Sequence, residues 1–324
     1  MEFKKIITKR ELETWPSWDL VFEWEDAFCH YLSLNLKYDK EIRYNKYYMK
    51  LPSLFDIFLT KENSIVFEMK PQLINNRNNK KNIIPYIIDF YLKEKKELQL
   101  FYSSYNKCPF VIISSLEVYN YLRQLSCPLR CVHLALSISD KYRITPRTRF
   151  EKPYDLVLMG RQNPVLLSYF EDYIKKSSRK IKYVYRIQEG RIFNYYTSDG
   201  ELIGDINTRE KYITLLRKSK ICLFSTPGID GGEKRTNGFN QVTPRFLEFI
   251  SAGCHVIARY RPNADTDFFE ISKFSPSIES YNDFENIMEK CLNTEVDMEF
   301  YAKYLKKHYT SQRCLKFKDI VLNI

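Results

Sequence analysis

The sequence lacks both a long apolar run and an apolar N-terminal segment. Of its 324 residues 44% are hydrophobic, yet no run approaches the ~20 residues of a membrane-spanning helix. Residues 1–13, MEFKKIITKRELE, lack the apolar core of a secretory signal peptide. We therefore expect a globular, cytoplasmic protein, and the length is sufficient for two domains of ordinary size.

Recognisable metal and disulfide patterns are also missing. The eight cysteines are dispersed, without a CxxC pair. One local group, Cys127, Cys131 and His133, lacks the fourth ligand of a tetrahedral zinc site. We predict reduced cysteines, no bound metal and no cofactor.

Glycine is absent from residues 1–148, whereas all nine glycines lie between Gly160 and Gly253. Strand-like runs alternate with helical segments in both halves, which indicates parallel α/β layers. The polar, basic segment 140–153 is bounded by prolines and suits a linker. The sequence therefore predicts an α/β protein with domains at 1–148 and 149–324.

Residues 221–260 predict a strand, a glycine-rich loop, a helix and a second strand. Four of the nine glycines fall in the loop: Gly228, Gly231, Gly232 and Gly238. We expect Thr243 to cap the helix, Pro244 to open it and Gly253 to end it. Backbone amides at such a loop and helix start suit a phosphate or diphosphate.

The run 242–260, VTPRFLEFISAGCHVIARY, resembles the signature segment of GT-B glycosyltransferases of the group 1 kind, including the branch related to spore-maturation glycosyltransferases. In that family the helix carries a donor-binding glutamate and is followed by a glycine, as Glu248 and Gly253 are here. Many relatives have two glutamates eight positions apart, but the earlier position here is Asn240. The residues alone also allow a simple surface pair of Glu248 with Arg245 at i and i+3.

The run 156–164, LVLMGRQNP, is similar to the first strand and turn of the donor domain in the same family. There an arginine after the glycine commonly faces the donor diphosphate, and Arg161 holds that position; the lysine that many relatives place next is absent. The resemblance is strongest over 154–270. It implies two Rossmann-like domains facing a cleft, with an acceptor-side domain first, a donor domain second and C-terminal helices packing back toward the first. The donor-binding residues that we predict are Arg161, Thr226, Pro227, Gly228, Asn240, Thr243, Arg245 and Glu248.

The resemblance implies an enzyme, a glycosyltransferase of the hexosyltransferase type that needs no metal. It would move a sugar from a nucleotide-diphosphate-sugar donor to a glycan or lipid-linked acceptor in cell-surface polysaccharide biosynthesis. The first domain should supply any catalytic carboxylate. The candidates are Asp89 and Glu117, followed by the acids of FEWED: Glu23, Glu25 and Asp26.

Two other functions fit part of the sequence. Fifty-one Lys and Arg against 40 Asp and Glu give a net charge of +11, which favours polyanions or an anionic membrane surface. Asp56, Glu68 and Lys70 have the loose D…ExK arrangement of magnesium-dependent PD-(D/E)xK-like nucleases. That pattern leaves the glycine-rich half unexplained. The other alternative is a non-catalytic protein that binds nucleotide sugars or polyanions. We expect peripheral contact with the inner membrane face and no specific nucleic acid partner.

Overall fold

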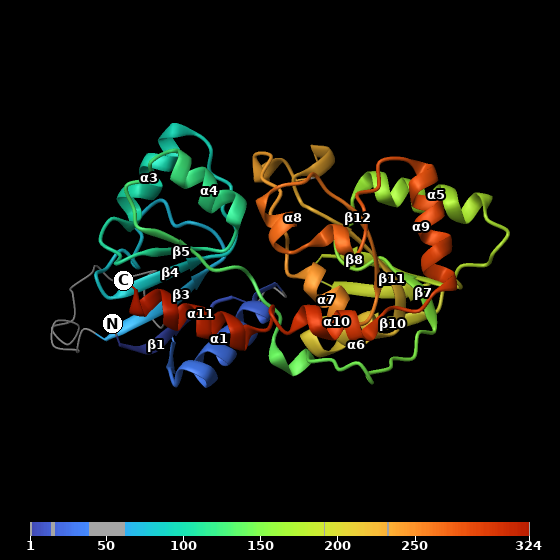
Figure 1. Ribbon diagram of the computed structural model, residues 1–324, viewed down its shortest axis with the longest axis horizontal. Coiled ribbons are helices and arrows are strands. Elements are labelled where there is room, and N and C mark those ends of the chain that lie inside the picture. The colour runs from blue at the N-terminus through green and yellow to red at the C-terminus, as the bar shows by residue number, and fades with distance from the viewer. Residues whose placement is uncertain (1, 14–16, 39–61, 191, 232, 324) are drawn as a thin grey trace. The chain divides into compact units, whose positions relative to one another are not determined.

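The computed structural model describes residues 2–13, 17–38, 62–190, 192–231 and 233–323 (Figure 1). The chain divides into two compact units. Residues 1–115, 119–135 and 310–324 form the first, and residues 116–118 and 136–309 form the second; the division expected from the sequence lay at 148/149. Each unit contains a six-stranded, mainly parallel sheet. The predicted α/β class with two Rossmann-like sheets is therefore confirmed.

All strands of the first sheet run parallel, in the order β2-β1-β3-β4-β5-β6. Their bounds are β1 Phe3–Thr8, β2 Asn35–Tyr38, β3 Asn63–Glu68, β4 Ile83–Ile87, β5 Val111–Ile113 and β6 Cys131–His133. Every residue of β4 and β5 is buried. Continuous apolar runs of this kind are typical of parallel strands that are covered on both faces.

Four helices accompany this sheet in the described residues: α1 Ser17–Leu32, α3 Lys95–Tyr105, α4 Leu116–Gln124 and α11 Thr310–Leu322. Helix α1 buries Val21, Trp24 and Phe28, which are spaced along one helical face. The centroid of the Phe28 ring lies 5.4 Å from that of Phe67 in β3 and 6.0 Å from that of Phe317 in α11. The last helix of the chain thus completes the core of the first unit.

The carboxyl group of Glu25 is buried inside this unit. Glu25 of α1 is 1% exposed. Its Oε2 accepts a hydrogen bond from the hydroxyl of Thr8 at 2.6 Å and one from Nε of Arg10 at 3.2 Å. Burial raises the pKa of Glu25 to about 7, against the opposing effects of Thr8 and Arg10.

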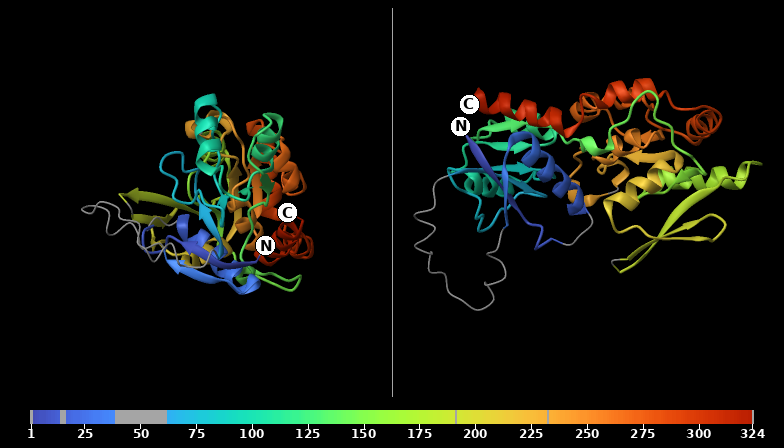
Figure 2. Two further views of the ribbon diagram at one scale, coloured as in Figure 1. Left: turned by 90° about the vertical axis from the view of Figure 1, so that its left-hand side faces the viewer. Right: turned by 90° about the horizontal axis from the view of Figure 1, so that it is seen from below.

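The second sheet has the order β10-β9-β8-β7-β11-β12. Its strands are β7 Tyr154–Val157, β8 Tyr183–Glu189, β9 Ile192–Thr197, β10 Leu202–Asp205, β11 Ser219–Ser225 and β12 His255–Arg259. Strands β8, β7, β11 and β12 are parallel to one another. Strands β9 and β10 add an antiparallel ribbon at one edge (Figure 2).

Gly190, Gly200 and Gly204 lead the sequence to predict an irregular loop between β8 and the next helix, but the structure forms the β9–β10 ribbon there. Gly190 and Gly200 adopt positive φ angles of 63° and 86°, which L-residues with side chains rarely adopt, and they mark the two turns. Between them, Tyr195 and Thr197 alternate with more exposed neighbours. The alternation is the pattern of a strand with one buried face.

The helices of the second unit are α5 Pro164–Lys176, α6 Arg209–Arg217, α7 Arg245–Ser251, α8 Ala264–Phe268, α9 Tyr281–Asn293 and α10 Met298–Leu305. Helix α7 starts one residue later than expected: Pro244 is the N-cap and no side chain caps it, so Thr243 is not the cap. Gly253 ends it with φ 64°, and the amide of Cys254 bonds to the carbonyl of Phe249 at 3.0 Å. Nowhere in the described residues is a helix long and apolar enough to cross a membrane.

We predict that the buried Glu25 makes stability depend on pH. Between its unfolded pKa of 4.5 and its folded pKa of about 7, the folded state keeps a proton that the unfolded state has lost, so stability falls as pH rises. The shift corresponds to on the order of 3 kcal/mol. Urea unfolding of Glu25→Gln from pH 4.5 to 7.5 should lose this slope. Asp26→Asn, a change in the 60% exposed neighbour, should keep it; an unchanged slope in Glu25→Gln would contradict the assignment.

Candidate functional site

The second sheet has a topological switch point between β7 and β11. From β7 the chain passes to β8 on one side, whereas β11 and β12 lie on the other side. Because these four strands are parallel, the loops that leave their carboxyl ends emerge at one edge and diverge there. Such a point is the usual ligand-binding crevice of an open α/β sheet.

A pocket of about 260 Å³ lies at this point. It is formed by the segment that follows β7, the segment that follows β11 and the residues before and at the start of α7. Five of the predicted donor-binding residues line it: Arg161, Thr226, Pro227, Thr243 and Arg245. Three others lie outside its lining: Gly228, Asn240 and Glu248.

Two guanidinium groups are held at this pocket. Nη1 of Arg245 donates to the carbonyl oxygen of Arg161 at 2.9 Å. A methyl group at Gly160 would stand 2.8 Å from Nη2 of Arg245, so the glycine leaves the space that this guanidinium occupies. The side chain of Arg161 is 62% exposed and pairs with Glu233. The cationic groups therefore belong to adjacent segments of one wall.

Glu233 is an anion at the same place. Its Oε2 also accepts from Nε of Arg235 at 2.5 Å. Burial works against its ionisation, but the hydrogen bonds of Arg235 and Arg161 hold the pKa of Glu233 below its usual value. At neutral pH the carboxylate therefore neutralises part of the positive charge that an anionic ligand would meet.

The loop after β11 is anchored by an ion pair that the sequence analysis did not identify. Arg259, at the carboxyl end of β12, holds both oxygens of Asp230, at 2.7 and 2.9 Å. Nδ2 of Asn163 donates to Asp230 at 2.9 Å, and the Arg259 hydrogen bonds keep the pKa of Asp230 low. Asp230 has φ 55°. In the sequence, Arg259 could have been recognised as a candidate because it is a cation at the end of an apolar strand.

Thr226 and Asn240 join the two ends of the glycine-rich loop. The hydroxyl of Thr226 donates to Oδ1 of Asn240 at 2.8 Å, and both residues are buried. The backbone amide of Asn240 donates to Oε2 of Glu117 at 2.8 Å, within the stretch 116–118 that groups with the second unit. These contacts fix the loop ends, and they leave Asn240 beside the pocket instead of in its wall.

Glu248 does not form the surface pair with Arg245 that the spacing allowed. It is 3% exposed, and its Oε1 pairs with Nη2 of Arg209 at 2.7 Å. Its Oε2 accepts from the hydroxyl of Tyr212 at 3.0 Å. Burial and the adjacent carboxylate raise the pKa of Tyr212 well above its ordinary value. The sequence contains no pattern that predicts the contacts of Arg209 and Tyr212, both in α6, with Glu248 of α7.

Asp89 and the candidate nuclease residues lie elsewhere, whereas Glu117 contacts the loop end at Asn240. Asp89 follows β4 in the first unit, where its amide donates to the carbonyl of Met69 at 2.8 Å. Glu68 is completely buried and accepts from Tyr105 and, at 2.7 Å, from Asn78; Asp56 lies outside the described residues. Among the residues that the structure describes, no cluster of three or more His, Cys, Asp or Glu could hold a metal ion. The position of Glu68 is therefore that of a buried, hydrogen-bonded carboxyl group in the core of the first unit.

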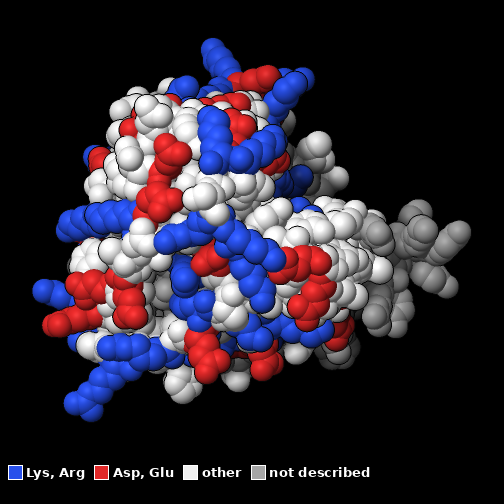
Figure 3. All heavy atoms as spheres, turned by 90° about the vertical axis from the view of Figure 1, so that its right-hand side faces the viewer, with Lys and Arg blue, Asp and Glu red and all other residues white. Residues whose placement is uncertain are grey.

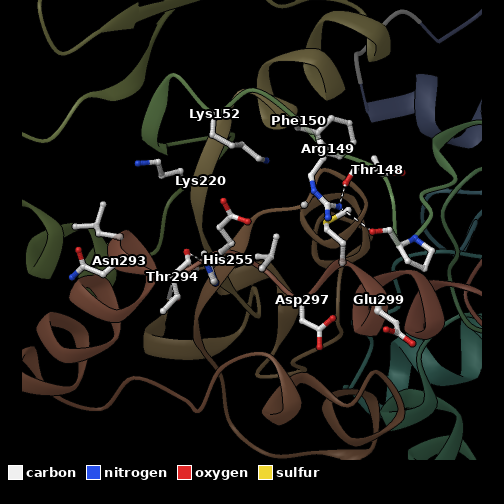
Figure 4. Close-up of a pocket in the computed structure, with 16 residues that line it drawn as sticks. Thr148, Arg149, Phe150, Lys152, Lys220, His255, Asn293, Thr294, Asp297 and Glu299 are labelled. Carbon is white, nitrogen blue, oxygen red and sulfur yellow. Dashed lines mark hydrogen bonds between the residues drawn. The ribbon is translucent and has the colours of Figure 1, made fainter.

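A larger cavity of about 750 Å³ lies at the opposite ends of the strands. Its walls include Lys220 and His255, near the amino ends of β11 and β12 (Figure 4). Cations and acids both line it: Arg149, Lys152, Lys220, Glu295, Asp297 and Glu299. Nζ of Lys152 already donates to the carbonyl of Ala252 at 2.6 Å. By volume alone this cavity would be the better candidate for a ligand site. The position at the switch point and the presence of Arg161 and Arg245 favour the smaller pocket instead.

Positive charge is not concentrated on the face shown in Figure 3. Lys and Arg side chains are distributed across it among Asp and Glu side chains (Figure 3). A continuous cationic surface is what a long polyanion would require. The described residues on this face form no such surface (Figure 3).

Comparisons with solved structures found similarities at low sequence identity. No protein-family model and no curated protein matches the chain. The structure is similar to sucrose-phosphate synthase from Thermosynechococcus elongatus (9% identity, TM-score 0.42, covering 81% of this chain and 68% of that one). It is also similar to the pneumococcal O-GlcNAc transferase GtfA in complex with UDP and GlcNAc (13% identity, TM-score 0.45, covering 81% of this chain and 52% of that one). A third similar structure is the glycotransferase of kitacinnamycin (12% identity, TM-score 0.43, covering 98% of each chain). The chain spans about half the length of GtfA.

We predict that Gly228→Ala disturbs the pocket through steric conflict. A methyl group there would stand 2.3 Å from the carbonyl oxygen of Phe239, so backbone must move, at about 1–3 kcal/mol. Urea unfolding measures the loss. Gly200→Ala is the matched control, because its φ of 86° is unfavourable but its surroundings are open; it should cost about 1 kcal/mol. An equal, small loss in both variants would show that the loop at Gly228 is loosely packed.

Proposed function

We propose that the second unit binds the diphosphate of a nucleotide-sugar donor and that the protein transfers the sugar to a glycan or lipid-linked acceptor. One observation carries the proposal: Arg161 and Arg245 meet at a pocket on the switch point between β7 and β11. The resemblance of residues 154–270 to group 1 GT-B glycosyltransferases, spore-maturation branch included, supports it. The expected setting is cell-surface polysaccharide biosynthesis at the cytoplasmic face of a membrane.

The charges available in the pocket decide how the diphosphate is held. The backbone amides in the first turn of α5, at Val165 and Leu166, donate to Oδ1 of Asn163 at 2.9 and 3.0 Å. The diphosphate charge must therefore be met mainly by the guanidinium groups of Arg161 and Arg245, which bind phosphate oxygens in a planar, two-pronged geometry. Thr226 and Thr243 supply polar groups in the same walls.

Transfer requires stabilisation of the departing diphosphate. Positioned guanidinium groups supply this where charge develops, and they do so without a metal ion. We therefore propose a metal-independent hexosyl transfer. If the reaction inverts the anomeric centre, a carboxylate must also take the acceptor proton; Asp89 and Glu117 stay our candidates.

We retain Glu248 as the proposed group that binds ribose or sugar hydroxyls; because it is buried and lies outside the lining of the pocket, a ligand reaches it only after neighbouring side chains move. A carboxylate can accept about four hydrogen bonds, and Arg209 and Tyr212 each occupy one of its oxygens. Acceptor capacity remains for a hydroxyl pair. The buried position excludes water, which strengthens each of these bonds.

Ligand binding to the purified protein tests the function. Thermal stability is measured with nucleoside diphosphates and nucleotide sugars, first without metal, then with Mg²⁺ and with a chelator. A metal-independent shift with one diphosphate, followed by transfer or slow hydrolysis of the matching donor, supports the proposal. A shift only with Mg²⁺ or oligonucleotides favours the nuclease or polyanion alternative, and binding of the donor without turnover favours a non-catalytic protein.

Arg161→Ala should weaken diphosphate ligands about tenfold, or about 1.4 kcal/mol, because one partly exposed charge-assisted contact is lost. Nucleosides without phosphate should bind as before. Calorimetric titration measures both. Arg179→Ala is the control, since Arg179 also pairs with a glutamate, Glu289, on the surface of the same unit. Equal losses for nucleoside and diphosphate would indicate a structural effect.

Glu233→Gln should have the opposite effect. The change removes the anion that pairs with Arg161 and that repels a diphosphate, so we expect a several-fold gain in diphosphate affinity. The dependence of affinity on salt should also become steeper. Glu289→Gln provides the control for losing one carboxylate from this unit. A loss of affinity in Glu233→Gln would show that the glutamate orients Arg161 for the ligand.

A further inference from the structure

Two thiols in the first unit are in contact. Sγ of Cys127 and Sγ of Cys131 are 3.9 Å apart. The two residues are separated by Pro128, Leu129 and Arg130. This site lies on the segment between α4 and β6, apart from the pocket in the second unit.

Secondary structure holds both ends of this segment. Helix α4 ends through Ser126, whose φ is 52°, and the amide of Cys127 bonds back to the carbonyl of Leu122 at 3.0 Å. Cys131 is the first residue of β6 and is in register with Val111 of β5. The thiols therefore meet because the fold places their backbones, and the sulfurs must approach from 3.9 Å to a bond length of about 2.05 Å for a disulfide to form.

The two thiols are accessible. Both are half-buried, whereas Cys222, Cys254, Cys291 and Cys314 are buried. They line a pocket of about 280 Å³ together with Tyr119, Arg123 and Arg130. The guanidinium of Arg123 lies 5.8 Å from the ring of Tyr119, which keeps it at this wall. A small reagent with carboxylate groups suits such a pocket.

The environment also distinguishes Cys127 from the other half-buried thiols. A hydrogen bond from Cys131 lowers the pKa of Cys127 and raises that of Cys131. Burial raises the pKa values of Cys29 and Cys108 to about 11. Because the thiolate is the nucleophile, Cys127 is the one that reacts first.

We propose that Cys127 and Cys131 form a thiol–disulfide exchange site for an anionic, low-molecular-weight disulfide of the glutathione class. The Cys127 thiolate attacks one sulfur of that disulfide, forms a mixed disulfide and releases one small thiolate. Cys131, after losing its proton, attacks the Cys127 sulfur and releases the second small thiolate. The protein loses two hydrogen atoms in total, and the small disulfide is reduced to two thiols.

The test uses the full chain and oxidised glutathione. After acid quenching and alkylation, peptide mass spectrometry should show loss of both thiols to one internal disulfide, reversed by dithiothreitol. Cys131→Ser should retain glutathione on Cys127, Cys127→Ser should form neither product, and Cys108→Ser should behave as the wild type. Wild-type protein alone supplies a second readout, because maleimide should label Cys127 before Cys29 and Cys108 at neutral pH.

Three results would overturn the proposal. One is a wild-type glutathione adduct on Cys127 that never becomes the internal disulfide. Another is oxidation or labelling of Cys29 or Cys108 as fast as Cys127. The third is the absence of any adduct in Cys131→Ser that retains the wild-type circular dichroism spectrum.

Discussion

The parallel pairing of β7 with β11 is the constraint on which the candidate site depends. Leu156 is in register with Ile221, and Val157 with Cys222, so the two strands end at one edge of the sheet. Leu156 and Val157 of β7 and residues 221–224 of β11 are apolar and buried, which fixes the register of the two strands through the core. The segments that follow them carry Arg161 and the glycine-rich loop. The apolar core of the sheet thus decides which polar residues meet, although the side chains that line the pocket come from the strand ends and the segments after them.

The need to balance positive charge at this edge explains the partners of the two arginines in the pocket. Two guanidinium groups near each other repel, and each needs an acceptor when no ligand is bound. Arg245 uses the carbonyl of Arg161, and Arg161 uses Glu233. The loop that carries Glu233 is in turn tied to the sheet through Asp230 and Arg259. A diphosphate bound here, as we propose, would compete with Glu233 for the guanidinium of Arg161, and its affinity would depend on the difference between these two charged contacts.

The sequence predicted the parts of this arrangement that are local. Apolar runs within residues 221–260 located β11 and β12, and Gly253 located the end of α7, because burial and a left-handed backbone each require particular residues at particular positions. Contacts between distant residues were not predictable in this way. Glu248 joins Arg209 across 39 positions, and its neighbour Arg245 joins residue 161 instead. Side chains on one helix turn have several candidate partners, and only the packing of α6 against α7 selects among them. The β9–β10 ribbon was missed for a related reason, since its glycines also suit an irregular loop.

Buried polar groups show how the fold separates structural from chemical carboxylates. Glu68 ends β3, at the same kind of position that Arg161 takes after β7, yet it is completely enclosed by Tyr105 and Asn78. Burial raises the pKa of Glu68, so its neutral, hydrogen-bonded form is favoured. A metal ion needs the opposite, an ionised and reachable carboxylate. Position at a strand end is therefore not enough to make a site. At the switch point of the second sheet Arg161, in the segment that follows β7, stays exposed, and this difference is why we propose the ligand site there.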